Sequence, residues 1–331
     1  MKGLVFGVAI ITDRFSSECI YQEARTKGVS LAMLGTSSEW NSEAILLACK
    51  RFGEKHHIKH VPVIVGVTGS YRYMAQSMRS TYSHDLKTGF KMLMNDLYLL
   101  AGDKESPYYD ILVLPQLDHG DPVKDKWIFT EGIEYLSAVM FDCQSYPYGE
   151  NLDMTRAYVE EYGGRVMIEA AIEEVSVEGG HGGAYDCNKN DGQYIKRAAD
   201  YVKRTGIDFL VADLGTEQQS SSRTSRYFGD RARSLTQALG KKMLVLHGAS
   251  ALQEDRLSEV ADDGILKVNM WTRIARESGK YAAHKIAERM AAIEKNDFEA
   301  AESRHYMNDN LEYAVGIMEK LLGDLKYDRF A

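Results

Sequence analysis

Residues 110–120 of the chain, DILVLPQLDHG, join an apolar run of strand length to a polar, titratable end. Seven other short apolar runs resemble it: SLAML (30–34), VPVIVGV (61–67), YLSAVMF (135–141), RVMIEA (165–170), DFLVADL (208–214), KMLVLH (242–247) and GILKVNM (264–270). Near-continuous apolar strands are typical of parallel sheets covered on both faces. The sequence therefore predicts eight buried strands.

Segments with helical periodicity separate these strands, for example SEAILLACKRFGEKH, GENLDMTRAYVEEYG, GQYIKRAADYVKRTG and DRARSLTQALG. Strands that alternate with helices predict a parallel sheet of the α/β class. Eight such units fit a (β/α)8 TIM barrel better than a doubly wound sheet. We expect a single TIM-barrel domain over residues 1–331, in which approximately 271–331 form C-terminal helices that pack on the barrel or on a partner subunit.

The charge balance limits the classes of partner. The chain has 40 Lys and Arg against 48 Asp and Glu, a net charge of −8, which argues against nucleic acid and an anionic membrane surface. The N-terminal apolar run is too short for a membrane span and lacks a cleavage site. The 4 cysteines are far apart and form no C-x-x-C pair, as expected for reduced thiols. We therefore expect a cytoplasmic protein with no nucleic-acid or membrane partner.

Titratable residues recur where the predicted strands end. The clearest cases are Asp118, His119, Asp142, Glu169 and His247. The carboxyl ends of TIM-barrel strands share the face that carries the active site, so we expect these side chains to converge. Imidazole and carboxylate ligands suit zinc or a similar divalent ion.

The residues after His247 suggest a second use of the same face. In LVLHGAS, the backbone N–H of Gly248 and the hydroxyl of Ser250 could hold a phosphate oxygen. Loops after the late strands of a barrel often bind phosphate. The sequence thus predicts a local anion site in an acidic protein.

Five motifs, in order and spacing, resemble the class II fructose-bisphosphate and tagatose-bisphosphate aldolases. They are LDHG (117–120), VMFDCQSYPYGENLDMTRAYVEEYGGRVMIEA (139–170), DFLVADLGT (208–216), LVLHGAS (244–250) and KVNMWT (267–272). The resemblance covers roughly residues 20–290. It implies a (β/α)8 barrel, a dimer or tetramer of identical chains, and a zinc ion (Zn²⁺) that polarises the carbonyl of dihydroxyacetone phosphate. The implied activity is a lyase that makes or breaks a carbon–carbon bond in a phosphorylated ketose through an enediolate.

The resemblance also implies roles for single residues. Asp118 matches the family's proton-handling aspartate, while His119 and His247 match zinc ligands and Asp142 an acidic residue near the metal. The residues expected to hold the ketose phosphate or the enediolate are Gly248, Ser250, Asn269 and Thr272.

The chain departs from the family pattern at two positions where the family has metal-site residues. Gln218 stands where the family has a third zinc histidine, which makes Gln218 a candidate substrate-binding residue. The family's E-x-E pattern on strand five reads Glu169-Ala170-Ala171, so Glu169 is kept as a catalytic candidate and the second carboxylate is missing.

Three further positions also differ from the family. The loop VEGGHGGAYD offers Glu178 or His181 as the acid–base group. Arg223 is a candidate clamp for a second phosphate, because guanidinium binds phosphate in a bidentate way. Trp271 replaces an acidic residue before Thr272.

Three functions remain open from the sequence. In the first interpretation, the metal is retained and the chain is an aldolase of altered substrate range. Alternatively, the metal is lost and the barrel acts on a sugar phosphate through Asp118, His119, Glu169 and His181. In the third interpretation the chain binds a sugar phosphate or supports a catalytic subunit without catalysing a reaction.

Overall fold

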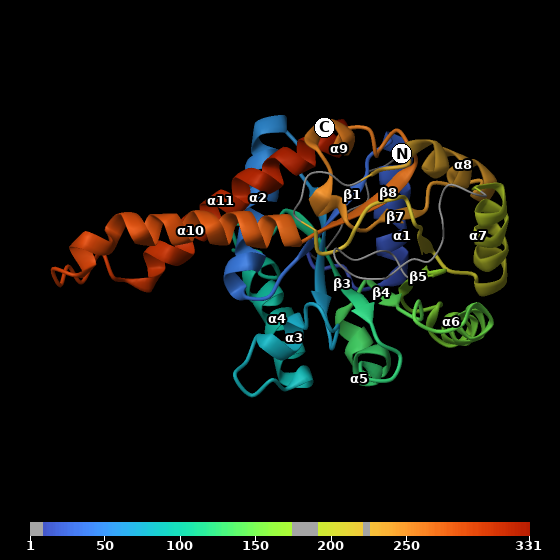
Figure 1. Cartoon of the computed structure of the whole chain (residues 1–331), viewed down its shortest axis with the longest axis horizontal. Coiled ribbons are helices and arrows are strands. Elements are labelled where there is room, and N and C mark those ends of the chain that lie inside the picture. Colours follow the sequence, from blue (N-terminus) through green and yellow to red (C-terminus); the bar gives the residue numbers. More distant parts are fainter. Residues whose placement is uncertain (1–8, 174–190, 221–225) are drawn as a thin grey trace.

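A computed structural model describes residues 9–173, 191–220 and 226–331 (Figure 1). Within these ranges, eight parallel strands close into a barrel in sequence order, with β1 paired to both β2 and β8. The strands are β1 (Leu31–Gly35), β2 (Val61–Thr68), β3 (Ile111–Gly120), β4 (Ala138–Phe141), β5 (Met167–Ala171), β6 (Phe209–Val211), β7 (Leu244–Leu246) and β8 (Ile265–Met270). The predicted (β/α)8 TIM barrel is confirmed.

Helices surround the barrel, and side-chain caps set where several of them begin. Asp13, Ser38 and Asp85 accept a backbone N–H of the first turn of α1, α2 and α4, as N-cap residues do. The helices are α1 (Arg14–Lys27), α2 (Glu39–His56), α3 (Gln76–Arg79), α4 (Leu86–Ala101), α5 (Lys126–Thr130), α6 (Tyr148–Tyr162), α7 (Asp191–Thr205), α8 (Gly229–Leu239), α9 (Glu254–Leu257), α10 (Thr272–Ile293) and α11 (Ser303–Asp324). Single 3₁₀ turns are η1 (Gly132–Tyr135), η2 (Ala249–Ala251) and η3 (Tyr327–Phe330).

Strand β3 carries an irregularity at its carboxyl end. Its register against β4 shifts between Leu117 and Gly120, and His119 has a left-handed backbone with φ +48°. In a regular strand, neighbouring side chains point to opposite faces. A bulge re-aims them, so the consecutive residues Asp118 and His119 both reach the same cavity.

The barrel interior contains a polar layer below the strand ends. Gln116, Glu169 and Lys267 point inward from β3, β5 and β8, and all three are fully buried. Two residues further along their strands, Asp118 and Asn269 point inward again, because the side-chain period of a strand is two. The polar layer is therefore the floor beneath the strand-end residues.

The C-terminal helices follow β8 directly. Helices α10 and α11 pack against each other, and their paired ends extend away from the barrel in Figure 1. Helix α11 also packs on α2, and the hydroxyl of Tyr327 accepts a hydrogen bond from the N–H of Ala32 in β1 at 2.8 Å. In the described part of the chain, none of the helices has the length and apolar character needed to cross a membrane.

Candidate active site

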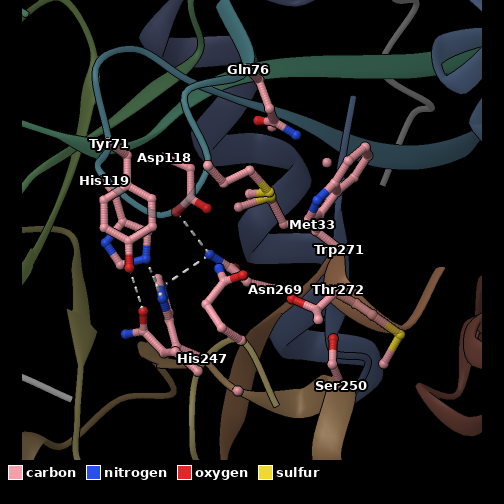
Figure 2. A pocket seen from close by; sticks show the side chains of 17 residues that line it. Met33, Tyr71, Gln76, Asp118, His119, His247, Ser250, Asn269, Trp271 and Thr272 are labelled. Carbon is pink, nitrogen blue, oxygen red and sulfur yellow. Dashed lines mark hydrogen bonds between the residues drawn. The ribbon is translucent and has the colours of Figure 1, made fainter. Parts of the chain in front are cut away.

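Side chains from distant parts of the chain line one cavity at the carboxyl ends of the strands (Figure 2). Asp118 and His119 come from β3, His247 follows β7, and Asn269 comes from β8. The flexible side chains of Met33 and Met74 also line this cavity.

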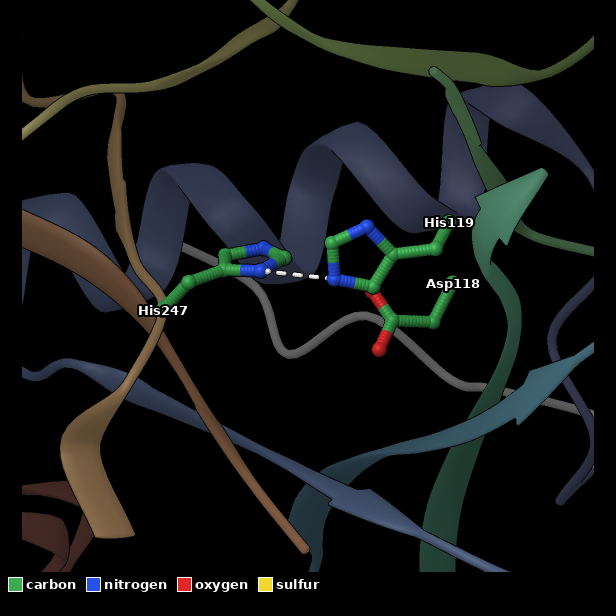
Figure 3. A group of neighbouring side chains, drawn as sticks. All are labelled: Asp118, His119 and His247. Carbon is green, nitrogen blue, oxygen red and sulfur yellow. Dashed lines mark hydrogen bonds between the residues drawn. The ribbon is translucent and has the colours of Figure 1, made fainter. Parts of the chain in front are cut away.

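The two histidines point toward each other and are in direct contact (Figure 3). Nδ1 of His247 lies 3.2 Å from Nε2 of His119, and the rings are nearly perpendicular. Asp118 completes the group, because one possible ligand atom from each of the three residues lies within 4.8 Å of the others. The two predicted zinc histidines are thus brought together.

The spacing of this group fits a metal ion. Two nitrogen ligands at about 2.0 Å from a tetrahedral zinc lie about 3.3 Å from each other, close to the 3.2 Å between His119 and His247. Imidazole nitrogens are ligands that zinc accepts, and the carboxylate of Asp118 lies close by. The residues present therefore fit a zinc ion even though Gln218 replaces the third histidine.

Asp142 lies behind His119 and outside this group. Its Oδ2 is 2.8 Å from Nδ1 of His119, on the opposite ring edge from His247. This contact orients the ring and leaves Nε2 toward the cavity, as an outer carboxylate does for a ligating histidine. Burial disfavours the charged form of His119, but the carboxylates of Asp118 and Asp142 outweigh it and raise its pKa.

Glu169, expected as a catalytic group, is held in the floor of the site. It is 0% exposed, forms an ion pair with Lys267 and accepts a hydrogen bond from Gln116. Its other oxygen lies 3.2 Å from Nε2 of His247. Burial alone would raise the pKa of Glu169, but Lys267 and His247 lower it to about 2. Glu169 therefore acts on the site through His247 and contributes no surface to the cavity.

Three residues predicted to bind the phosphate, Gly248, Ser250 and Thr272, also line the cavity. Gly248, with a left-handed backbone at φ +73°, leads into η2, and Ser250 accepts the N–H of Arg273 at 3.2 Å. Thr272 begins the 22-residue helix α10, whose N-cap residue Trp271 provides no capping side chain. Backbone N–H groups at the start of a long helix favour a phosphate oxygen.

Asn269 contacts both Asp118 and His247. Its Nδ2 donates to Oδ1 of Asp118 at 3.2 Å, while its Oδ1 has no partner. Asn269 therefore lies between the carboxylate and the histidines, where it can meet the reacting carbons of a substrate rather than its phosphate.

Tyr71 covers the histidine pair from the loop after β2. Its ring stacks on His119 with centroids 4.1 Å apart, and its hydroxyl donates to Oε1 of Gln218 at 2.9 Å. Gln218 is thus placed in the cavity wall beside the histidines, but its Nε2 has no partner. Burial, together with Asp142 and Asp118, raises the pKa of Tyr71, which keeps its hydroxyl protonated.

Some of the predicted site residues lie outside the described part of the chain, namely Glu178, His181 and Arg223. Conversely, the sequence did not single out Tyr71, Gln76 and Lys267. Lys267 had a visible signal, because a lysine inside the apolar run GILKVNM needs a buried partner. Tyr71 and Gln76 lie in an irregular loop and a short helix, where no periodicity marks them.

A comparison with models of protein families identifies the relatives of this chain. Residues 18–326 match the model described as fructose-bisphosphate aldolase class-II. The chain belongs to this family. The class II aldolase resemblance seen in the sequence is thereby confirmed, and the chain is an aldehyde-lyase that acts on a carbon–carbon bond of a phosphorylated sugar.

Other class II aldolases share a modest part of the sequence. Fructose-bisphosphate aldolase of Streptococcus pneumoniae is 28% identical over 267 residues, which covers 78% of each chain. The enzyme of the same name from Streptococcus pyogenes is also 28% identical over 267 residues, with the same coverage.

Solved structures share the fold at lower identity. Fructose-bisphosphate aldolase from Campylobacter jejuni superposes with a TM-score of 0.72 and 14% identity, covering 96% of each chain. An aldolase from Escherichia coli superposes with a TM-score of 0.64 and 17% identity, covering 96% of this chain and 98% of that one. This class II aldolase therefore shares its barrel fold with proteins whose sequences differ from it at most positions.

Proposed function

We propose that this aldolase uses dihydroxyacetone phosphate as its donor and an aldehyde as its acceptor, with an enediolate between them. One observation carries the proposal: Asp118, His119, His247 and Asn269 share a cavity with the first turn of α10. A phosphorylated three-carbon donor needs an anion site at one end and groups that handle charge and protons at the other. The cavity offers both.

The phosphate would be held at the start of α10. The hydroxyl of Ser250 already accepts the N–H of Arg273, so its own proton is available to a phosphate oxygen. Gly248 allows a close backbone approach, and the N–H groups around Thr272 supply further donors. This local site suits a protein with a net charge of −8, because no broad basic surface is needed.

We propose zinc as the cofactor, with His119 and His247 as ligands and Asp118 close by. A bound zinc ion would act as a Lewis acid that stabilises negative charge on the substrate's carbonyl oxygen. Asp142 holds the ring of His119, and Glu169 contacts His247 from below. These two carboxylates orient the histidines and raise their basicity toward a metal.

Asp118 is proposed to transfer the proton at the aldehyde oxygen. Asn269 donates to Oδ1 of Asp118 and fixes the carboxylate, which leaves Oδ2 for the substrate. In the condensation the donor carbon loses a proton, a carbon–carbon bond forms to the aldehyde carbon, and the resulting alkoxide takes up a proton. A carboxylate at this position suits the last step.

The assembly and the compartment are proposed on separate grounds. We propose a cytoplasmic homo-oligomer, a dimer or tetramer, in which residues 1–331 form one barrel domain. Phe298, near the end of the α10–α11 pair, is 83% exposed, as expected of a residue that packs on a partner subunit. Cys19, Cys49 and Cys143 are free thiols, which suits a reducing compartment.

Two measurements test the proposal. Protein purified without chelator should contain one zinc per chain and should exchange a carbon-bound proton of dihydroxyacetone phosphate with solvent, and His119→Ala should lose the zinc. Active but metal-free protein would show instead a metal-independent enzyme acting on a sugar phosphate. Binding of dihydroxyacetone phosphate without exchange or turnover would favour a non-catalytic support subunit.

A further inference from the structure

Three side-chain amides line the cavity with an atom that has no hydrogen-bond partner. The atoms are Nε2 of Gln76, Nε2 of Gln218 and Oδ1 of Asn269. A buried polar atom without a partner is costly, and such atoms in a folded protein call for an explanation. Because all three face the same cavity, a ligand with several oxygen atoms would satisfy them.

The orientation of the Gln76 amide is set by the backbone. Its Oε1 accepts the backbone N–H of Thr68 at 2.8 Å, and the backbone N–H of Gln76 donates to the hydroxyl of Thr68 at 2.9 Å. Only the carbonyl oxygen of the amide can accept from Thr68, so the NH₂ group is the one turned to the cavity. Gln76 is 2% exposed and is therefore a fixed donor.

Gln76 lies on the side of the proton-handling carboxylate. Thr68, which holds Gln76, is the direct neighbour of Asp118 in the pairing of β2 with β3. In Figure 2, Gln76 lies at the opposite end of the view from Ser250 and Thr272, which form the anion-binding end. A molecule that reacts beside Asp118 and extends away from the phosphate thus meets the Gln76 amide.

Within the described part of the chain, the cavity walls around Gln76 carry no positive charge. Trp271 and Gln76 meet over Gly35, where an added Cβ would lie 2.9 Å from Trp271 Cε3 and 3.1 Å from Gln76 Nε2. Met33 and Met74 line the same cavity. No Lys or Arg of the described residues lines it. A phosphate placed at this end would lose its hydration without gaining a cation.

We propose that Gln76 binds an oxygen of the acceptor aldehyde, and that this end of the cavity selects a short, uncharged hydroxyaldehyde over a phosphorylated one. The inference rests on the proposed aldol reaction and adds its acceptor class. The amide N–H would donate to a hydroxyl or carbonyl oxygen, while Trp271 and Met33 contact the carbon chain.

The first experiment compares two acceptors that differ only in a phosphate. The unmodified protein is given dihydroxyacetone phosphate with either glyceraldehyde or glyceraldehyde 3-phosphate. In a separate assay without aldehyde, the exchange of a carbon-bound proton of dihydroxyacetone phosphate with solvent is measured. We expect kcat/KM for glyceraldehyde to be higher by roughly tenfold or more. Normal exchange with a preference for the phosphorylated aldehyde would overturn this inference only, whereas absence of exchange would overturn the aldol reaction and the inference with it.

The second experiment removes the hydrogen-bond donor of the Gln76 side chain. Gln76→Glu keeps an oxygen for the N–H of Thr68 but removes the NH₂ group, so KM for glyceraldehyde should rise roughly tenfold, by more than any change in the exchange rate. Gln237→Glu, the same substitution at an exposed position of α8, should leave both quantities unchanged. An unchanged KM in Gln76→Glu would remove Gln76 from the acceptor site.

Discussion

Asp118 and His119 are consecutive in the chain but meet different partners. The bulge in β3 turns both toward the cavity, where Asn269 binds Asp118 and Asp142 binds His119. Asn269 contacts Oδ1 of Asp118, and Nε2 of His119 is turned toward His247. These hydrogen bonds give the two neighbouring residues different surroundings, which suits the proposed proton transfer by Asp118 and the proposed metal binding by His119.

Replacing Asp118 should separate chemistry from binding. In Asp118→Ala we expect turnover to fall by about 10²–10⁴-fold, because the proton-transfer group is lost, while calorimetric binding of dihydroxyacetone phosphate stays nearly intact. Zinc content should also stay at the wild-type value. Loss of zinc would reassign Asp118 as a ligand, and full turnover would remove its catalytic role.

The floor of the site should be sensitive to loss of one charge. Lys267→Met leaves the buried Glu169 carboxylate without its ion-pair partner, so we expect the free energy of unfolding to fall by about 3–5 kcal/mol in urea titrations. The double variant Glu169→Gln/Lys267→Met should recover a large part of this loss, because no buried charge is left unpaired. A double variant as unstable as the single one would show that packing, not charge, is responsible.

The same pair predicts how stability depends on acid. The pKa of Glu169 is lowered to about 2 from 4.5, so its stabilising effect is fully present above about pH 4.5 and is lost as the pH falls toward 2. Between these values the wild type should lose more stability than the double variant, as followed by urea unfolding at several pH values. Parallel pH profiles of the two proteins would contradict the ionised, buried state of Glu169.

Among the elements, the turn from β7 through η2 to α10 forms the proposed anion-binding end of the cavity. The turn depends on Gly248, because its backbone is left-handed and passes close to another loop. A Cβ on Gly248 would lie 2.7 Å from the carbonyl oxygen of Glu217. The close packing of the two loops therefore sets where the N–H groups of this turn point.

Gly248→Ala should weaken phosphate binding for this reason. We expect the affinity for dihydroxyacetone phosphate to fall by roughly tenfold or more, because the turn must move away from Glu217. Gly240→Ala is a matched control, since Gly240 also has a left-handed backbone, at φ +69°, but an added Cβ meets no atom within 4 Å. Calorimetry that finds equal affinities in the two variants would contradict the proposed anion site.

At the scale of the whole molecule, the C-terminal segment stabilises the barrel near its closure. The carbonyl of Leu325 accepts the N–H of Ser30, and Tyr327 accepts that of Ala32, so residues beyond α11 hold the start of β1. Strand β1 in turn pairs with β8, which carries Asn269. Residues nearly 300 positions apart in sequence thus support the same edge of the site.

Tyr327→Phe should therefore destabilise the whole barrel. The variant keeps the ring but leaves the buried N–H of Ala32 without an acceptor, which costs about 1–3 kcal/mol. The free energy of unfolding measures this loss. Tyr313→Phe, at a more exposed position of α11, should change it by less than about 0.5 kcal/mol. Equal stability of both variants would show that the Tyr327 hydroxyl is dispensable.

Sequence patterns alone were enough to predict the barrel and the face on which the polar residues meet. Apolar runs such as VPVIVGV alternate with amphipathic helices, and parallel strands of one barrel necessarily end on one face. For that reason the sequence predicted that Asp118, His119 and His247 converge, and they do line one cavity.

The partners that each of these side chains contacts follow instead from the three-dimensional packing of the elements. Glu169 is paired with Lys267 beneath the cavity, Asp142 lies behind His119, and the amide of Gln76 is turned inward by Thr68. These contacts join residues from different strands and loops, and they depend on a bulge, a ring stack and the direction of single hydrogen bonds. Local sequence patterns indicate on which face of its helix or strand a side chain lies. They do not indicate which residue of another element that side chain will contact.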